Sequence, residues 1–322
     1  MKKIFRISLG IVIAAVFMWL ILKNININEM KVSFRQANVG MICASIFIFL
    51  LGYACRIQRW KIMLSSENPN ISWKQCSGPL MASIAANNVL PLRAGDFLRA
   101  FGFNSRLNVS ATTSLTTLVV ERLLDMLMLL VVLGITLYYF NISSSAILGI
   151  GSIGLLGCAL IILCLLLFPG ILRPICYAIS NALRPKLPTL SNRLNDLFTN
   201  IFSSLEHMSK NEVMIKLIFW SICAWFLEGA VFWLIAMALP TIANTFAAWL
   251  AFPVGTLSTL IPGTPGYVGT FDYFTSQSMI VLGNDYTAAA TFVFIVHFVL
   301  WLPPTLIGGA YLLFNPVVSK RR

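Results

Sequence analysis

The sequence predicts an all-α polytopic membrane protein, and three observations lead to that fold class. Hydrophobic residues make up 58% of the 322 residues, charged residues make up only 11%, and the mean hydropathy is +0.84. A soluble globular domain carries roughly a quarter charged residues. The apolar residues stand in long uninterrupted runs, which favours membrane helices over a β-barrel. This composition excludes a soluble domain, a disordered chain and a disulfide-stapled secreted module.

Six apolar segments are long enough to be full transmembrane helices, because roughly 20 apolar residues span a bilayer. They cover residues 4–22, 39–55, 115–140, 146–168, 213–239 and 287–314. The first is too long for the core of a signal peptide and no Ala-x-Ala site follows it, so we expect it to stay as an anchor. We predict a single membrane domain over 1–322, divided into a first half (1–140), a linking helix (146–168), a cytoplasmic loop (169–212) and a second half (213–322).

Two further apolar segments, at 77–103 and 245–282, are interrupted by proline, glycine and polar residues. Interrupted helices of opposite orientation are typical of inverted-repeat transporters, in which half-helices meet near the membrane midplane. Non-helical backbone at that depth persists only where it is buried in protein or lines a watery cavity. We therefore predict six full transmembrane helices plus two broken, re-entrant hairpins in an inverted repeat. The alternative is eight ordinary transmembrane helices with proline kinks.

The distribution of basic residues orients the chain. Lysine and arginine gather at both termini, at 56–74 and in the loop 169–212, whereas the connections 141–145 and 240–244 carry no charge. By the positive-inside rule both termini then face the cytoplasm. The basic loop at 23–35 is the exception to this pattern. The net charge of +12 indicates anionic lipid surfaces rather than nucleic acid, since no basic run exceeds a few residues.

The cytoplasmic loop is the one sizeable polar region. Within it, residues 190–208 place apolar side chains at helical spacing among charged ones, which predicts an amphipathic helix on the membrane surface. The chain has no glycine-rich phosphate loop, no dinucleotide fingerprint and no metal-ligand spacing, so we expect no cofactor and no metal. The seven cysteines are interpreted as structural, because none forms a Cys-x-x-Cys pair.

The first broken segment concentrates polar side chains around its proline–glycine break. Asp96 lies three residues from Arg93 and three from Arg99, so one carboxylate is predicted to fix two guanidiniums. Charges at membrane depth are tolerated mainly when paired or facing water, and a guanidinium fork suits a phosphate. A salt-bridge knot that only satisfies the turn is the alternative. The predicted substrate-binding residues here are Asn87, Asn88, Arg93, Asp96 and Arg99.

A second charged motif stands on the predicted helix at 115–140. Glu121 and Asp125 share one helix face, and Arg122 reaches Asp125 three residues on. We add all three to the predicted substrate-binding residues, as an internal network whose outside partner is Arg93 or Arg99. Such a network would lock the first broken segment against this helix. A purely structural role is an equal alternative.

The third motif is the proline- and glycine-rich break in the second broken segment. Pro262, Gly263, Gly266 and Gly269 prevent a continuous helix and allow close approach of the backbone to a ligand. The amides freed at the start of the next helix suit an anion or a head group. Asp272 follows about one turn later and completes this predicted site. Its alternative role is that of an ordinary first-turn helix acid.

Two ionisable residues stand alone within apolar helices. Glu228 and His297 are predicted as proton-coupling residues, against the alternatives of a buried hydrogen bond and a satisfied helix contact. A basic and aromatic cluster at the end of the second span is predicted to be an interfacial anchor, with a lipid-binding site as the alternative or an additional role. This cluster consists of Arg56, Arg59, Trp60 and Lys61.

Together these motifs resemble the flippase-like integral membrane family of the lysylphosphatidylglycerol synthase transmembrane region. The resemblance rests on residues 56–60, 88–96 with Arg99, 121–125 and 262–272, and it covers nearly the whole chain. In the multifunctional synthases this domain is associated with moving an aminoacylated phospholipid between leaflets, while a soluble carboxy-terminal domain makes that lipid. The transferase domain is absent from this sequence, so the resemblance implies lipid translocation or binding rather than lipid synthesis.

We therefore expect a non-enzymatic translocase of a phospholipid or a polyprenyl-phosphate-linked lipid. Its expected location is the cytoplasmic (inner) membrane of a prokaryote. One alternative is a membrane-embedded lipid or polyprenyl transferase that uses Asp96 or Glu121 as its base. The other is a non-catalytic subunit that docks a partner glycosyltransferase or lipid synthase through the loop 169–212.

Overall fold

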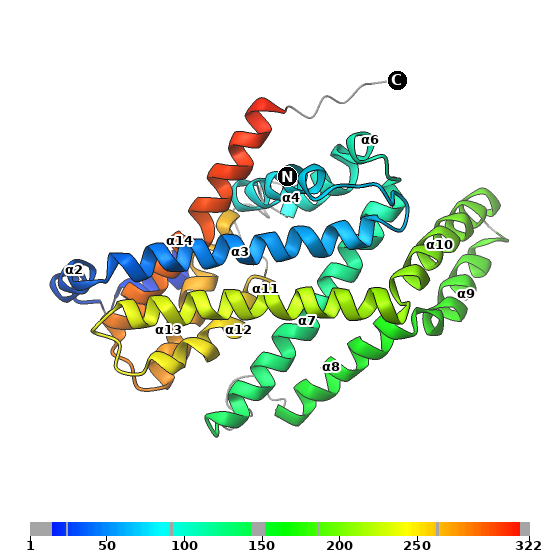
Figure 1. The fold of residues 1–322 in the computed structure, drawn as a ribbon. Helices are drawn as coiled ribbons and strands as arrows, with labels where there is room; N and C mark the ends of the chain where they lie inside the picture. The colour runs from blue at the N-terminus through cyan, green and yellow to red at the C-terminus, as the bar shows by residue number, and fades with distance from the viewer. Residues whose placement is uncertain are drawn as a thin grey trace.

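The protein is a bundle of helices, seen in a computed structural model (Figure 1). The structure describes residues 15–23, 25–90, 93–142, 152–185, 187–261 and 264–315. The regular elements within these ranges are all helical, which confirms the predicted all-α class. Most of the first predicted span, 4–22, lies outside the described residues, and its last part, 15–22, is helical.

Three single helices in the described ranges are long and apolar enough to cross a membrane. They are α3 (Val39–Leu64), α11 (Asn211–Ala238) and α14 (Tyr286–Phe314). A fourth candidate is a pair of helices, Ile153–Leu167 and Pro169–Leu183, that is bent by 91°. The molecule is therefore a multi-pass membrane protein, while the count of six full spans remains a prediction.

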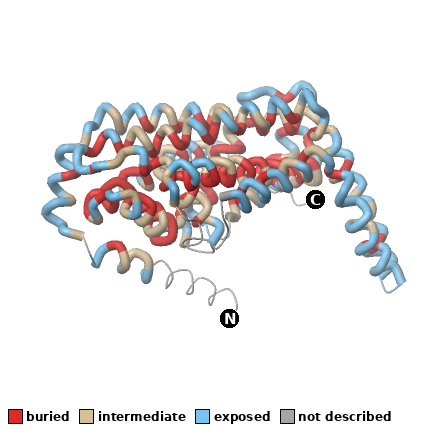
Figure 2. The backbone as a smooth tube through the Cα atoms, turned by 90° about the horizontal axis from the view of Figure 1, so that it is seen from below, coloured by how far each residue is buried: buried red, intermediate tan, exposed pale blue. Residues whose placement is uncertain are grey.

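The long helices pack in pairs around the core. Helix α3 lies along α11, and α7 (Ala111–Tyr139) lies along α8 (Ser152–Leu167) (Figure 1). Helix α14 packs on α4 (Trp73–Val89). Buried residues concentrate in the middle of the bundle (Figure 2). This arrangement places the polar residues of α3, α7 and α11 inside the protein instead of against lipid.

Side-chain caps fix where several of these helices begin. Asn38 accepts a hydrogen bond from the Met41 amide at the start of α3, and Ser110 accepts one from Thr113 at the start of α7. Ser72 and Gln75 form a reciprocal capping box at the start of α4. Such caps satisfy backbone donors that have no partner in the first helical turn.

The first broken segment is interrupted where the sequence predicts it. Helix α4 ends at Val89, and the chain resumes as α5 (Ala94–Phe97) and a π-helical turn, η2 (Leu98–Gly102). Arg93 joins the two parts with a left-handed backbone (φ +52°). Gly95 lies so close to α4 that an added Cβ would come within 1.9 Å of the Ser83 carbonyl oxygen. The segment therefore folds back onto its own first helix.

The second broken segment is also divided into helices that pack on each other. Its parts are η5 (Thr245–Ala247), α12 (Ala248–Ser258), η6 (Pro265–Tyr267) and α13 (Thr270–Val281), and α12 contacts α13. Pro253, which the sequence suggests as a breaking residue, lies inside α12 without ending it. The breaks are confirmed, whereas the re-entrant paths and the inverted repeat remain predictions.

Two regions differ from the sequence-based boundaries. Helix α3 continues to Leu64, nine residues beyond its predicted end, because its charged last turns pack inside the protein rather than at an interface. The loop 169–212 holds the predicted helix, α10 (Pro188–Met208), and an unpredicted helix, α9 (Arg173–Leu183), that packs against it. The residues of these two helices are mostly exposed, and the pair stands at one end of the bundle (Figure 1).

Candidate functional site

The two breaks meet at a cavity of about 140 Å³ within the bundle. Asn88, at the end of α4, lines it from the first broken segment, and Gly266 and Tyr267 line it from the second. Helices α3, α11 and α14 complete the walls. Both broken segments thus contribute residues to the lining of one partly open cavity, as expected for a binding site built from discontinuous membrane helices.

An ion pair forms one wall of the cavity. The Arg56 guanidinium on α3 donates a short hydrogen bond to the Glu228 carboxylate on α11. It also lies over the rings of Tyr53 and Trp225, with centroid distances of 5.4 and 4.7 Å. Glu228 therefore has the buried partner that the sequence left open as an alternative.

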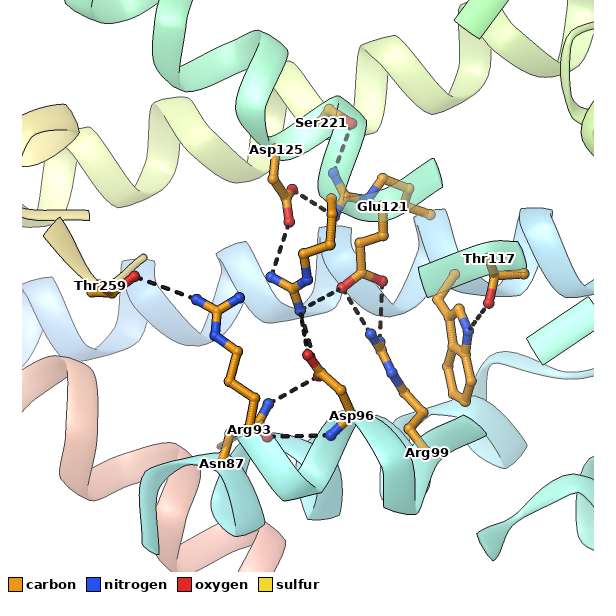
Figure 3. A network of polar contacts seen from close by, with 12 residues as sticks. Asn87, Arg93, Asp96, Arg99, Thr117, Glu121, Asp125, Ser221 and Thr259 are labelled. Atoms are coloured by element: carbon orange, nitrogen blue, oxygen red, sulfur yellow. Dashed lines mark hydrogen bonds and ion pairs between the residues drawn. The ribbon is translucent and has the colours of Figure 1, made fainter. Parts of the chain in front are cut away.

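Arg93 reaches the same cavity through two of its lining residues. Its Nε donates to the Tyr267 hydroxyl at 2.9 Å, and its Nη2 donates to the Thr259 hydroxyl at 3.4 Å. Figure 3 shows the Arg93 side chain extending toward Thr259 and away from the carboxylates. Within the described part of the chain, Arg93 has no carboxylate within 4.0 Å. It is a half-buried positive charge whose partners are all neutral.

A histidine and an aspartate hold the second break. His297 on α14 places Nδ1 2.6 Å from Asp272 Oδ1 and Nε2 2.9 Å from the Gly266 carbonyl oxygen. The second Asp272 oxygen accepts a hydrogen bond from the Gly269 amide at 2.8 Å. Asp272 is thus the predicted first-turn helix acid, and it is also the partner of His297.

A separate network of charges fastens the first break to α7. Arg99 donates two hydrogen bonds to the Glu121 carboxylate, at 3.1 and 2.9 Å. Arg59 on α3 contacts Asp125 and Ser221, both at 2.8 Å (Figure 3). Arg99 and Arg59 are each only 1% exposed. Neither guanidinium is accessible to a head group.

Arg122 bridges the three carboxylates of this network. It lies 3.5 Å from Asp96 and Glu121 and 3.6 Å from Asp125, and its side chain is 39% exposed. Its contacts are therefore longer and more solvated than those of the two buried arginines. Three arginines and three acids balance, so the network as a whole carries no net charge.

The structure corrects the predicted role of Asp96. Asp96 does not fix Arg93 and Arg99; it accepts a hydrogen bond from the Asn87 amide at 2.9 Å and pairs with Arg122 (Figure 3). The local backbone explains the difference. The left-handed Arg93 and the π-helical turn that contains Arg99 direct the two guanidiniums to different neighbours.

The predicted interfacial anchor is wrong for two of its residues. Arg59 pairs with Asp125 on α7, and Trp60 is fully buried and donates from Nε1 to the Thr117 hydroxyl at 3.1 Å. The Arg99 guanidinium lies over the Trp60 ring at 5.1 Å. This part of α3 therefore supports the first broken segment from inside the protein.

The structure separates the predicted site residues into two groups. Those lining the cavity are Asn88, Gly266, Glu228 and His297, and those in the charge network are Asn87, Asp96, Arg99, Glu121, Arg122 and Asp125. Gly269 precedes α13 with a left-handed backbone (φ +91°). Pro262 and Gly263 lie outside the described residues. The described residues contain no cluster of three or more side chains suited to a metal ion.

Several cavity residues were missed by the sequence analysis. Tyr53, Thr259, Tyr267 and Trp301 all line it or bond to residues that do. Uncharged aromatic and hydroxyl residues are common in membrane helices, so nothing in the sequence marks these four. The sequence did indicate that Arg56 needs a partner inside the protein, because an arginine within reach of a membrane span is costly unless it is partnered.

An all-helical multi-pass bundle with buried ion pairs and a cavity lined by several charged and polar side chains defines an integral membrane protein with a candidate site between its helices. The chain matches the family described as the lysylphosphatidylglycerol synthase TM region over residues 7–308, and it belongs to that family. This confirms the resemblance drawn from the motifs. Among curated proteins, none matches the chain.

Proposed function

We propose that the protein translocates a phosphate-bearing lipid, either a phospholipid or a lipid-linked sugar, across the cytoplasmic membrane. The observation that carries this proposal is Arg93, a positive charge at the meeting point of the two breaks with neutral partners only. Even a half-buried charge is costly when no counter-charge is near, and a bound anion reduces that cost.

The shape of the guanidinium narrows the choice of anion. Its planar fork of donors matches the oxygens of a phosphate. Arg56, which lines the cavity from α3, is positioned to contact the same head group. Membership of the family supports a phospholipid context. Arg99, which the sequence placed beside Arg93, is assigned a supporting role because Glu121 occupies its donors.

The ion pairs favour a translocase over the membrane-embedded transferase. That alternative needs Asp96 or Glu121 as a general base. Glu121 accepts two hydrogen bonds from Arg99, and charge-assisted bonds of this kind weaken a carboxylate as a base. The docking alternative uses the exposed helices α9 and α10, and it assigns no role to Arg93.

Leaflet exchange of head-group-labelled lipids in proteoliposomes tests the proposal. We expect exchange faster than in empty liposomes for at least one anionic, zwitterionic or polyprenyl-phosphate lipid. Arg93→Gln should slow it by about tenfold or more, because a hydrogen-bonded charge pair is lost. Arg35→Gln is the matched control, since Arg35 is exposed on α2 (Ile27–Gln36) and its loss should leave the rate unchanged.

Two results would contradict the proposal. Exchange equal to that of empty liposomes for all three lipid classes would exclude translocation and bring the docking role forward. Exchange that is equally fast in wild type and in folded Arg93→Gln protein would remove Arg93 from the site.

A further inference from the structure

Both ring nitrogens of His297 face hydrogen-bond acceptors. Nδ1 lies 2.6 Å from a carboxylate oxygen of Asp272, and Nε2 lies 2.9 Å from the backbone carbonyl oxygen of Gly266. A carboxylate and a carbonyl oxygen can only accept. A neutral imidazole carries one N–H and therefore can serve only one of them, whereas an imidazolium serves both.

We propose that His297 is held as an imidazolium. The hydrogen bond from its Nε2 proton to the Gly266 carbonyl oxygen, here named the latch, then fixes that carbonyl at the cavity wall. Loss of that proton would turn a donor into a lone pair facing the carbonyl oxygen at hydrogen-bond distance. The contact between α14 and the second break would then be repulsive instead of attractive. The backbone at Gly266 already adopts a left-handed conformation (φ +71°), so no other residue type fits there without strain.

The surroundings of His297 supply one dedicated counter-charge. Asp272 on α13 contacts it directly. The other ionisable groups that face the same cavity are Tyr53 and Arg56 on α3, Glu228 on α11 and Tyr267 on η6. Arg56 and Glu228 neutralise each other, and Tyr267 accepts a hydrogen bond from Arg93. Asp272 is therefore the group whose charge retains the proton on His297.

The latch also connects the two breaks through one face of α14. Trp301, one turn after His297, donates from Nε1 to the Asn88 carbonyl oxygen at 3.3 Å. The Asn88 amide in turn donates to the Trp301 carbonyl and to the Thr305 hydroxyl. An added Cβ on Gly266 would come within 3.0 Å of Trp301 Nε1. The Trp301 indole thus touches both breaks, so a change at Gly266 acts on the contact with Asn88.

Nitrogen-15 NMR of histidine tests this inference directly in the full-length protein. The chain has two histidines, His207 and His297, so in His207→Gln the remaining ring-nitrogen signals come from His297 alone. In lipid nanodiscs near neutral pH we expect two protonated ring nitrogens. A neutral tautomer at that pH would overturn the proposal. This measurement requires no lipid transport, so its failure is distinct from a failure of the proposed function.

A pair of variants tests the role of the counter-charge. In Asp272→Asn at the same pH we expect one protonated ring nitrogen on His297 instead of two, since the opposite charge that favours the imidazolium is lost. Asp285→Asn is the matched control, because Asp285 also caps a helix start but has no histidine partner. Two protonated ring nitrogens in both variants would overturn the assignment of Asp272.

Hydrogen–deuterium exchange of the backbone amides at 264–272 measures whether the latch holds this segment in place. When pH rises through the titration of His297, amides at 264–272 should exchange about tenfold faster than the intrinsic rate increase requires, since a charge-assisted hydrogen bond is lost. The Asp285→Asn protein should behave like wild type. Exchange at 264–272 that follows only the intrinsic rate would show that the proton does not hold this segment.

Discussion

The two broken segments meet at one cavity but are fastened in different ways. The first is tied to α7 by buried ion pairs, chiefly the double hydrogen bond between Arg99 and Glu121. The second is tied to α14 through one histidine, and within the segment one aspartate and the backbone of two glycines complete the contact. One break therefore depends on matched charges, and the other depends on close approach and a single titratable contact.

This difference indicates which of the two broken segments keeps its position when the protein changes conformation. Separating a buried ion pair leaves an uncompensated charge in a medium of low dielectric constant, which is among the most costly single changes in a protein. Releasing the Gly266 carbonyl from the His297 ring costs less, because one hydrogen bond is lost while His297 and Asp272 stay paired. We expect the first broken segment to stay in place and the second to rearrange. The predictions below test that contrast, starting with the largest effect.

Removal of the Glu121 charge should destabilise the protein most. Glu121→Gln leaves Arg99 buried without a counter-charge, and we expect a loss of about 3–5 kcal/mol in the free energy of unfolding. Unfolding in mixed micelles measures it. Glu206→Gln is the control, because Glu206 pairs with Arg173 on the exposed surface and its loss should cost about 1 kcal/mol or less. Similar losses in the two variants would remove the claim that the first segment is locked by charge.

Glycine substitutions compare the packing of the two segments. In Gly95→Ala the new Cβ meets the Ser83 carbonyl oxygen, which cannot move away, so we expect a loss of about 1–3 kcal/mol. In Gly255→Ala it meets the hydroxyl oxygen of Thr275, a side-chain atom that has no hydrogen-bond partner among the described residues, so the loss should be smaller. Gly157→Ala, with nothing within 4 Å, should be neutral or stabilising. The opposite ranking of Gly95 and Gly255 would make the second segment the more rigid one.

Within the charge network, the exposed bridge should matter less than the buried pair. Arg122→Gln breaks three contacts of 3.5–3.6 Å made by a side chain that is 39% exposed. We expect a loss of about 1 kcal/mol, since solvated pairs at such distances contribute little. The same unfolding assay measures it beside Glu121→Gln. A loss as large as that of Glu121→Gln would show that the network acts as one unit.

The smallest effect concerns the start of α7, on which the first segment rests. Burial raises the pKa of the Glu67 carboxyl, but hydrogen bonds from Thr113 and from the Ser110 backbone and hydroxyl outweigh it and hold the pKa below its ordinary value of 4.5. The stabilisation is therefore present above that value and is lost as pH falls through the lowered pKa.

Thermal unfolding of wild type and Glu67→Gln measures this contribution. The wild-type advantage should be largest near about pH 7 and should disappear under acid conditions. An advantage that stays constant as pH falls would show that the hydrogen bonds of Glu67 do not depend on its charge.

The sequence predicted more of the fold than of the cavity. Segment 115–140 corresponds to α7 at Ala111–Tyr139, and the partnership of Glu121 with Arg99 follows the prediction. These features are readable because apolar length and isolated charges have few explanations in a membrane. The end of α3 was misplaced because hydropathy stops at the first arginine, whatever surrounds it in the folded protein.

The cavity required the folded structure, because its residues come from separate helices. Arg93 and Tyr267 are 174 positions apart, and no periodicity in either segment indicates that they meet. The spacing of three residues between Asp96 and its neighbouring arginines gave the wrong pairing, because it presumes a regular helix. The chain at that point contains a left-handed residue and a π-helical turn.

The buried arginines also set an order of assembly during synthesis. Glu121 follows its partner Arg99 by 22 residues, and Asp125 follows its partner Arg59 by 66 residues. Glu228, by contrast, follows its partner Arg56 by 172 residues. At a ribosome speed of 5–20 residues per second, that interval lasts roughly 10–35 seconds. During this time Arg56 on α3 lacks its counter-ion. We therefore expect α3 to enter the bilayer at a shallow depth and to sink to its final position only when α11 arrives beside it.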